Sequence, residues 1–200
     1  MPTDLQRYWN HNTHYHRRVL RAVPGRARAV LDVGTGDGLL ACDLREQVPE
    51  VVGIDLDAEV LARARATGAD VQWVHGDFMT HPLPLGYFEL VASIATLHHA
   101  SDLASALTRL AALTAPGGRV VVIGCARPSK PRDFLVESAG IAQHHVLSRT
   151  RGFWQHSAPV QMRFPHTYSE ARAITTATLP GAKWRQLPLF RYLVVWSKQI

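Results

Sequence analysis

The sequence predicts an α/β fold, with a doubly wound, mostly parallel sheet and a C-terminal antiparallel strand pair. Between residues 29 and 124, short apolar runs alternate with segments of helical periodicity. These runs are apolar nearly throughout, as strands that are buried on both faces must be. Two more strand-like runs lie around Pro188 near the end of the chain. We therefore expect three layers, α/β/α, with helices on both faces of the sheet.

The individual elements can be placed from their hydrophobic periodicity and their turn residues. Strands are predicted at residues 29–33, 51–55, 71–75, 88–93, 119–124, 183–187 and 192–198. Helices are predicted at residues 39–47, 58–67, 102–113 and 134–149, with Gly68 as a C-cap residue. Residues 4–23 are expected to be helical, in one or two pieces, with Asn12 or Thr13 as a cap. Residues 153–165 are irregular and aromatic.

Length and composition indicate one globular domain with a single sizeable core. The chain has 200 residues, of which 46% are hydrophobic and 19% are charged. With only Cys42 and Cys125, neither near a metal-type partner in sequence, we expect a reducing compartment and no metal site. The absence of a signal-like segment and of a long apolar run predicts a cytoplasmic protein without a membrane span.

The net charge of +6 is less ordinary. Solvated surface charge is the simpler explanation, and binding of nucleic acid or of an anionic substrate is the alternative.

The segment LDVGTGDGL at residues 31–39 joins a predicted strand to a predicted helix. Glycines there permit a tight turn and close approach of a ligand to the backbone. Asp55, at the end of the next strand, can accept hydrogen bonds from ribose hydroxyls. A dinucleotide would place its pyrophosphate here, where Asp32 and Asp37 would repel it. The spacing is also Gly-x-Gly-x-Gly rather than Gly-x-Gly-x-x-Gly, so S-adenosylmethionine, which is cationic and lacks phosphate, fits better than NAD.

With these motifs the chain resembles the class I S-adenosylmethionine-dependent methyltransferases, which have a Rossmann-like fold. The resemblance covers residues 28–126 well and the remainder loosely. It is carried by VLDVGTGDG at 30–38, VGID at 52–55, HGDF at 75–78, FELVAS at 88–93, LHH at 97–99 and the stretch 110–123. In combination and in this order the motifs are specific for the superfamily, but they say little about the substrate.

The resemblance implies a role for each matching residue toward S-adenosylmethionine. Gly34, Thr35 and Gly36 would form the loop along the methionine part, and Asp32 would face its ammonium group. Asp55 would bind the ribose hydroxyls, and Leu56 would pack on the adenine. Asp77 would accept a hydrogen bond from the adenine amino group, next to the Phe78 N–H. Ser93 and Ile94 would offer backbone groups to the methionine end. The alternatives are that Asp55 is a plain helix cap and Asp77 a turn residue.

Two histidines are candidates for the chemical step. His98 and His99 follow the fourth strand, at the carboxyl edge of the sheet where ligands bind. Methyl transfer relies mainly on orientation, and a general base helps when the acceptor is a hydroxyl or a protonated amine. His99 is the stronger candidate and His98 the second, and each can instead be a hydrogen-bonded loop residue.

The segments flanking the core are expected to cover the site. Residues 1–27 would form a helical lid, with Tyr15 and His14 near the methionine carboxylate, or would pack as an aromatic stripe on the sheet. Residues 28–126 would be the cofactor-binding core, 127–181 a substrate cover and 182–200 the closing strands. The cover suits an aromatic or apolar small molecule with one polar anchor. Its aromatic, histidine and methionine side chains include Phe134, His144, His145, Phe153, Trp154, His156, Met162 and Phe164.

The sequence therefore predicts transfer of a methyl group to an oxygen or nitrogen atom of a small molecule. A nucleic-acid methyltransferase is a second hypothesis, which the basic charge favours. The chain has Ser93-Ile-Ala-Thr where an Asp/Asn-Pro-Pro-aromatic motif is typical, and Cys125 is its single cysteine near the site. A third hypothesis is a protein that binds S-adenosylmethionine without transferring methyl. The acceptor and the oligomeric state remain open.

Overall fold

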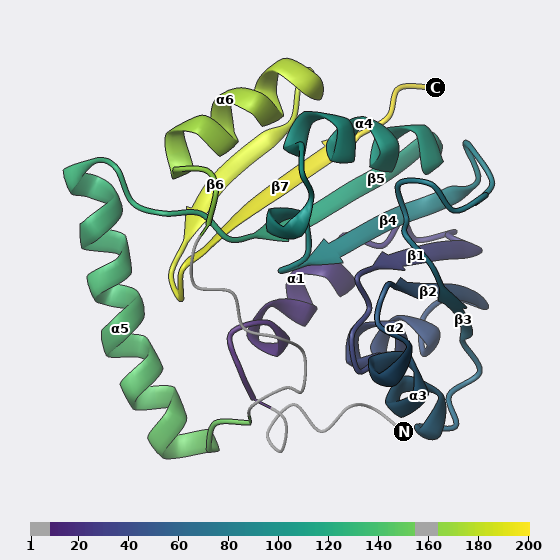
Figure 1. The fold of residues 1–200 in the computed structure, drawn as a ribbon, viewed down its shortest axis with the longest axis horizontal. Helices are drawn as coiled ribbons and strands as arrows, with labels where there is room; N and C mark the ends of the chain where they lie inside the picture. The colour runs from purple at the N-terminus through teal and green to yellow at the C-terminus, as the bar shows by residue number, and fades with distance from the viewer. Residues whose placement is uncertain (1–8, 155–163) are drawn as a thin grey trace.

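The computed structural model describes residues 9–154 and 164–200, and in this part of the chain a seven-stranded sheet forms the centre (Figure 1). The strand order is β3-β2-β1-β4-β5-β7-β6. Strands β1 to β5 pair in parallel, whereas β7 is antiparallel to both β5 and β6. The predicted sheet is confirmed. The strands are β1 (Ala29–Val33), β2 (Glu50–Asp55), β3 (Gln72–His75), β4 (Phe88–Ile94), β5 (Thr114–Gly124), β6 (Lys183–Leu187) and β7 (Arg191–Ser197).

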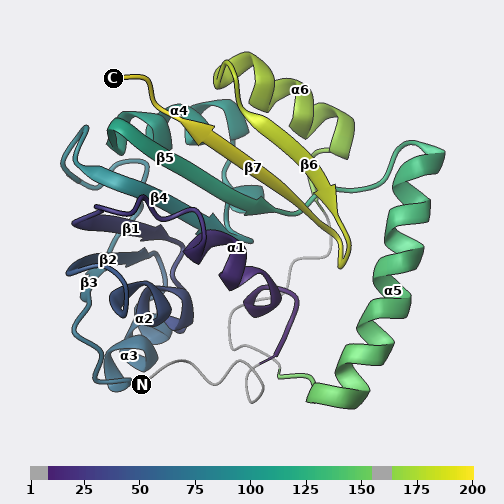
Figure 2. The same ribbon diagram turned by 180° about the vertical axis from the view of Figure 1, so that it is seen from behind.

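Helices cover both faces of the sheet, which gives the three predicted layers (Figures 1 and 2). One face carries α1 (His16–Leu20), α2 (Leu39–Arg45) and α3 (Ala58–Ala66). The other face carries α4 (Leu103–Leu113) and α6 (Tyr168–Thr178). The long helix α5 (Pro131–Arg151) stands beside the turn of the β6–β7 hairpin. Two short 3-10 turns, η1 (Thr13–Tyr15) and η2 (Leu97–His99), precede α1 and α4.

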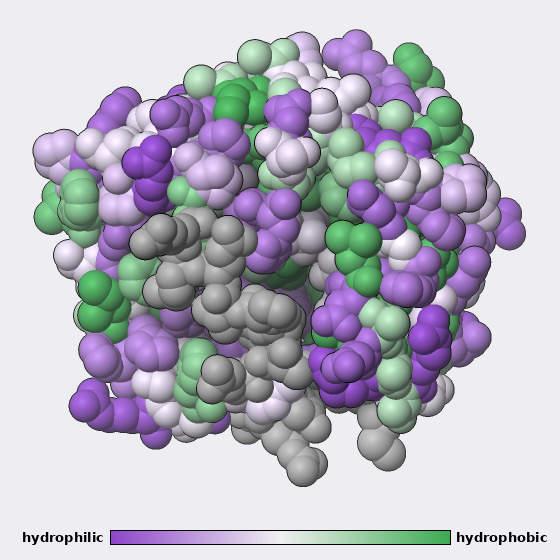
Figure 3. All heavy atoms as spheres, viewed as in Figure 1, coloured by the Kyte–Doolittle hydropathy of each residue, from purple (hydrophilic) through white to green (hydrophobic). Residues whose placement is uncertain are grey.

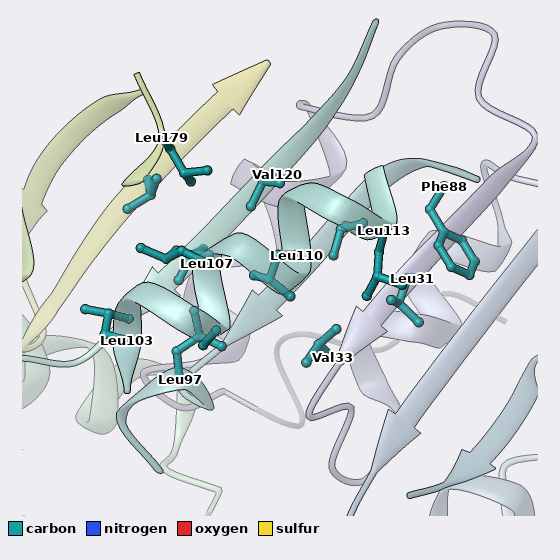
Figure 4. Close-up of a cluster of buried hydrophobic side chains, with 14 of the residues drawn as sticks. Leu31, Val33, Phe88, Leu97, Leu103, Leu107, Leu110, Leu113, Val120 and Leu179 are labelled. Carbon is teal, nitrogen blue, oxygen red and sulfur yellow. The ribbon is translucent and has the colours of Figure 1, made fainter. Parts of the chain in front are cut away.

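The core is split between the two faces because the central strands are apolar on both sides. Toward α4 and α6, the leucines of α4 point at residues of β1, β4 and β5 (Figure 4). Toward α1 and α2, Tyr15, Val19 and Leu44 pack on the opposite side of the same strands. Every residue of β1 is buried. Burial from both sides fixes the strand positions, and with them the loops that follow the carboxyl ends.

The position of the site follows from the strand order. The chain runs outward from β1 to β2 and β3, and then returns to place β4 on the other side of β1. At such a switch point the loops after β1 and β4 diverge and leave a crevice at the carboxyl edge. The segment after β1 is the predicted glycine loop, and the segment after β4 carries His98 and His99.

Helix α6 is absent from the sequence predictions, which place residues 127–181 in a substrate cover. Tyr168 and Ala171 are instead buried in the core on the α4 side of the sheet. A capping box begins the helix, because Thr167 Oγ1 accepts from the Glu170 N–H at 3.1 Å and the Glu170 carboxylate accepts from the Thr167 N–H at 2.7 Å. The Thr-x-x-Glu pattern at residues 167–170 is therefore the signal in the sequence that indicates where this helix begins.

The N-terminal helix is shorter than predicted. Within residues 9–23 the structure has the η1 turn and five residues of α1. Asn12 occupies the predicted N-cap position of η1 but makes no side-chain capping bond there. Asn10 Oδ1 instead accepts from the N–H groups of Asn12 and Thr13 at 2.8 and 2.9 Å. Residues 4–8 of the predicted helix, and His156 and Met162 of the predicted cover, lie outside the described residues.

On the face in Figure 3, hydrophilic and hydrophobic residues are interspersed over the described part of the molecule. None of the described helices combines the length and apolar character that crossing a membrane requires.

Candidate active site

A cavity of about 1480 Å³ opens at the carboxyl edge of the sheet. Its walls come from the loops after β1, β2, β3, β4 and β5, from the N-terminal segment and from the turn between β6 and β7. Of the residues predicted for the site, those that line the cavity are Asp32, Gly34, Thr35, Gly36, Asp55, Leu56, Asp77, Phe78, Ile94, His98 and His99. The structure thus brings together side chains that lie up to 67 positions apart, from Asp32 to His99.

The glycine loop after β1 has a left-handed backbone, which explains its composition. Gly34, Gly36 and Gly38 have φ angles of +70°, +58° and +79°. A Cβ atom on Gly34 would lie 2.1 Å from Thr96 Oγ1, whereas one on Gly36 would meet no atom within 4 Å. Gly34 is therefore required by packing against the loop after β4. Gly36 is the position at which the backbone itself faces open space, so only Gly36 fully matches the predicted close approach of a ligand.

Asp55 is held in place by two backbone groups. Its Oδ2 accepts from the Gly36 N–H at 2.9 Å, and its Oδ1 accepts from the Asp57 N–H at 3.0 Å. The alternative that Asp55 caps the following helix is wrong, because Asp57 does so. Asp57 Oδ1 accepts from the N–H groups of Glu59 and Val60 at 2.8 and 3.1 Å. The Asp55 carboxylate is thus oriented toward the cavity with lone pairs still available.

Asp32 lies at the bottom of the cavity, with 2% of its surface exposed. Its Oδ2 accepts from Thr35 Oγ1 at 2.7 Å. Burial raises the pKa of Asp32 to about 7, although the Thr35 hydrogen bond opposes this shift. Asp37, the other carboxylate invoked against a pyrophosphate, forms an ion pair with Arg63 at 2.9 Å. The charge argument against dinucleotides is therefore weaker than the sequence indicates.

The predicted adenine contacts lie at the rim. Leu56 is an exposed apolar side chain at the cavity, with 67% of its surface accessible. Asp77 also makes a turn, since its Oδ1 accepts from the Met79 N–H at 2.9 Å. Both interpretations of Asp77 therefore apply, because it lines the cavity as well.

Ser93, predicted to offer a backbone group, does not line the cavity. Its backbone lies within the sheet, paired with Val33 of β1 and Val122 of β5, and its buried hydroxyl donates to the Val33 carbonyl at 3.0 Å. Ser93 is corrected to a structural residue.

The two candidate histidines differ in their surroundings. His99 is exposed, whereas His98 is partly buried and its Nδ1 has no hydrogen-bond partner among the described residues. Burial lowers the pKa of His98 to about 4, and the nearby His99 and Arg191 add to this effect. The His98 ring is therefore neutral at pH 7. Ahead of it, Ala95 adopts a left-handed φ of +53°, a strained conformation that re-aims the chain after β4.

Tyr15 does not reach the cavity, and the prediction that it contacts the cofactor is wrong. It is 2% exposed, and its hydroxyl donates to the Pro188 carbonyl at 2.6 Å, in the β6–β7 turn. His14 is also outside the cavity wall and lies within 3.4 Å of Trp9 Nε1. The N-terminal residues that do line the cavity are Asn10, His11, Asn12, Thr13 and His16. Tyr15 instead packs on the sheet, as the alternative of an aromatic stripe predicts.

The end of the cavity away from the glycine loop is aromatic and basic. Phe153, Trp154 and Phe164 of the predicted cover line it, but α5 contributes only Glu137 to the wall. Sequence reasoning missed Phe190 and Arg191, which enter from the β6–β7 turn. No signal in the sequence connects that turn with the glycine loop, because the two are brought together only by the pairing of β7 with β5.

The residues at the glycine-loop end fit S-adenosylmethionine. The open space at Gly36, the oriented Asp55 carboxylate and the buried Asp32 suit a ribose next to a cationic amino-acid part. A metal site has no such support. Within residues 9–154 and 164–200 there is no group of three His, Cys, Asp or Glu side chains that could hold a metal ion.

Comparison with known proteins shows that the chain is similar to methyltransferases. Residues 31–122 match a family described as a methyltransferase domain. An uncharacterized methyltransferase of Mycobacterium tuberculosis is 42% identical over 194 residues, which is 96% of this chain and 98% of that protein. A demethylmenaquinone methyltransferase of Thermus thermophilus is 37% identical over 57% of this chain and 54% of its own length. A trans-aconitate 2-methyltransferase of an Azoarcus species is 30% identical over 98% of this chain and 72% of its own.

The fold is shared with solved structures as well. A SAM-dependent methyltransferase from Aquifex aeolicus superposes with a TM-score of 0.63 at 17% identity, covering 98% of this chain and 93% of that chain.

Proposed function

Since the chain belongs to the class I S-adenosylmethionine-dependent methyltransferases, we propose that it methylates an oxygen or nitrogen atom of a small molecule with an aromatic or apolar body. One observation carries this proposal: a single cavity joins the carboxylate-lined glycine loop to an aromatic end. The first part has the groups that bind a nucleoside and an ammonium ion. The second has the aromatic walls that bury a small apolar ligand.

The cofactor end is built from groups that are already in place. Asp55 receives the ribose hydroxyls, with both its oxygens held by backbone N–H groups. Gly36 lets the methionine part approach the backbone, and Asp32 attracts its ammonium group. When bound, S-adenosylmethionine supplies an electrophilic methyl group on a sulfonium. Leu56 and Phe78 pack against the adenine, and Asp77 accepts from its amino group.

The chemical step needs orientation first and a proton acceptor second. Phe153, Trp154, Phe164 and Phe190 orient the acceptor between them and the loop after β4. We assign the general base to this loop. His98 is favoured over His99, because its buried Nδ1 lacks a partner among the described residues and its ring is neutral at pH 7. With a pKa of about 4 this imidazole is a weak base, so it can take the proton of a hydroxyl acceptor as the oxygen is methylated and becomes strongly acidic.

The nucleic-acid hypothesis receives less support from the site. Cytosine C5 chemistry needs a nucleophilic thiolate, whereas Cys125 is buried and burial raises its pKa. The other relatives named above are methyltransferases for demethylmenaquinone and trans-aconitate, both small molecules.

The test is an assay for S-adenosylhomocysteine formation with a panel of phenols, amines and carboxylic acids. We expect turnover with members of one class in the wild type. Asp55→Ala should weaken cofactor binding at least tenfold, because the ribose loses its charged hydrogen-bond acceptor. Asp70→Ala, which removes an exposed carboxylate paired with Arg45, is the matched control. His98→Asn should lower kcat more than His99→Asn, with little change in cofactor affinity.

Two results would contradict this proposal. Cofactor binding that is unchanged in Asp55→Ala would remove the assigned ribose site. Turnover on an oligonucleotide, with none on the small molecules, would favour the nucleic-acid hypothesis.

A further inference from the structure

Two arginines line the acceptor end of the cavity, Arg127 and Arg191, and Arg127 is paired with Glu170 at 3.9 Å. Arg191 is the first residue of β7 and lines the cavity beside Phe190 and Cys125. Because β7 runs antiparallel to β5, its beginning lies at the carboxyl edge of the parallel strands. Three strand spacings separate β7 from β1, roughly 14 Å at about 4.8 Å each. The backbone of Arg191 therefore lies on the other side of the crevice from the glycine loop.

The guanidinium group of Arg191 has only neutral partners. It donates to Asn12 Oδ1 at 2.8 Å, and to the carbonyls of Leu189 and Phe190 at 3.4 and 3.2 Å. Its Nε is buried and has no hydrogen-bond partner within the described residues. Among those residues, no ion pair joins Arg191 to a carboxylate, although Arg45 and Arg63 each have one. Arg191 is half-buried, and a partly desolvated cation normally has an anionic partner because desolvation is costly.

The protein holds this arginine in a strained turn. Leu189 and Phe190 have φ angles of +57° and +61°, a conformation that non-glycine residues rarely adopt. The strain is maintained by contacts on both sides: Tyr15 donates to the Pro188 carbonyl, and Gly140 of α5 packs directly against Leu189. Strained residues of this kind cluster at ligand sites, where they fix the geometry of functional groups.

Most of the carboxylates that line the cavity lie at the glycine-loop end, and both of its arginines lie at the other end. Asp32, Asp37, Asp55, Asp57 and Asp77 lie on the side of β1, β2 and β3. At the other end, Arg191 stands with the rings of His11 and His98, which are neutral at pH 7 because burial lowers the pKa of each to about 4.

Two carboxylates line the wall beyond β4. Glu137 accepts from the Tyr168 hydroxyl at 3.3 Å. Asp102 caps α4 by accepting from the N–H groups of Ala104 and Ser105 at 3.1 and 3.0 Å.

We propose that Arg191 binds a carboxylate of the acceptor, so that the substrate class is a small organic acid with an aromatic or apolar body. This inference rests on the proposed function. The carboxylate would complete the hydrogen bonding of the guanidinium, while Phe153, Phe164 and Phe190 contact the rest of the molecule. The anion lies far from Asp32 and Asp55, and electrostatic attraction at one end and repulsion at the other set its orientation.

The test measures binding of a matched pair of probes, 3-phenylpropionate and 3-phenylpropionamide, by calorimetry with saturating S-adenosylhomocysteine. The wild type should bind the acid at least tenfold more tightly than the amide. Arg191→Gln should abolish that difference, while the affinities for the amide and for S-adenosylhomocysteine stay within about twofold. Arg191→Lys should keep part of the preference, since it retains the charge but not the planar fork. Arg185→Gln, an exposed arginine of the same hairpin, is the control and should behave as the wild type.

Every other outcome would overturn the proposal, and each result identifies the step of the argument that fails. An acid that binds no better than the amide, or not at all, shows that Arg191 is not a carboxylate anchor. Loss of S-adenosylhomocysteine affinity in Arg191→Gln, with a normal melting curve, would assign the arginine to the cofactor's own carboxylate. Failure of the wild type to bind S-adenosylhomocysteine would instead contradict the proposed function.

Discussion

Asp32 is a candidate binding group whose burial disfavours its own charged form. It is almost completely buried, and its one side-chain partner is the Thr35 hydroxyl. Burial raises the pKa of the Asp32 carboxyl to about 7, so in the free protein it is close to half protonated at pH 7. A cationic ligand next to this carboxyl would restore the charged form.

We therefore expect proton release when S-adenosylhomocysteine binds near pH 7. Because the ligand's ammonium group favours ionised Asp32, binding lowers its pKa, and affinity should rise as pH increases through 7. Calorimetry in two buffers of different ionisation enthalpy measures the released protons, on the order of half a proton per site at pH 7. Asp32→Asn, which keeps an acceptor for Thr35, should abolish the release. A proton count that is unchanged in this variant would mean that another group titrates.

At the scale of elements, the β6–β7 hairpin depends on α5 and on the N-terminal segment. Gly140 is one of only two buried residues in α5 among its 21. A Cβ atom at this position would lie 2.6 Å from the Leu189 backbone nitrogen. The hairpin turn is thus supported by a contact that only glycine permits, in a helix whose other residues are mostly solvent-exposed.

Replacing Gly140 with alanine should therefore destabilise the protein, opposite to the usual effect in a helix. Helix propensity favours alanine by about 1 kcal/mol, but displacing the Leu189 backbone costs about 1–3 kcal/mol. We expect a lower midpoint of urea unfolding, together with weaker acid binding, because Arg191 follows the same turn. Ser138→Ala, at an exposed position of the same helix, should be neutral or slightly stabilising. A Gly140→Ala variant that is more stable than the wild type would rule out this contact.

At the scale of the whole molecule, the cavity connects parts of the chain that are remote in sequence. Residues of the N-terminal segment and of the β6–β7 turn meet the loops after β1 and β4. The backbone N–H of Trp154 donates to the Trp9 carbonyl at 2.9 Å. The N-terminal segment and the segment after α5 therefore also contact each other. A ligand in this cavity touches several elements at once and should stabilise the fold as a unit.

S-adenosylhomocysteine should raise the melting temperature, whereas NAD at the same concentration should not. At one hundred times its Kd, a ligand that binds only the folded state adds about 2.7 kcal/mol to the free energy of unfolding. For a chain of this size, that corresponds to a shift on the order of 5–10 °C. Thermal unfolding with each ligand gives the comparison. A shift with NAD would contradict the charge argument, which the Asp37–Arg63 ion pair already weakens.

The parts of the fold that could be predicted share one property, which is that they are encoded locally. The apolar strands, the turn glycines and the helical periodicity specify β1 to β5 and the order of the loops. The carboxyl edge of a parallel sheet then brings those loops together, so Asp55 and His98 can be predicted from their positions after strands, whereas the family resemblance points to Asp32 and Asp77. Helix α6 was missed although its Thr-x-x-Glu cap lies in the sequence.

The tertiary structure decided what lies opposite the glycine loop. Tyr15 and Ser93 carry plausible site chemistry but are turned into the core, because each satisfies a backbone carbonyl there. Arg191 carries no motif, yet it enters the cavity because the antiparallel pairing of β7 with β5 brings its first residue to the ligand edge. The strands and the cofactor end can be predicted from the sequence, since both depend on residues that are near one another in the chain. The acceptor end depends on long-range pairing, and only the folded chain brings its residues together.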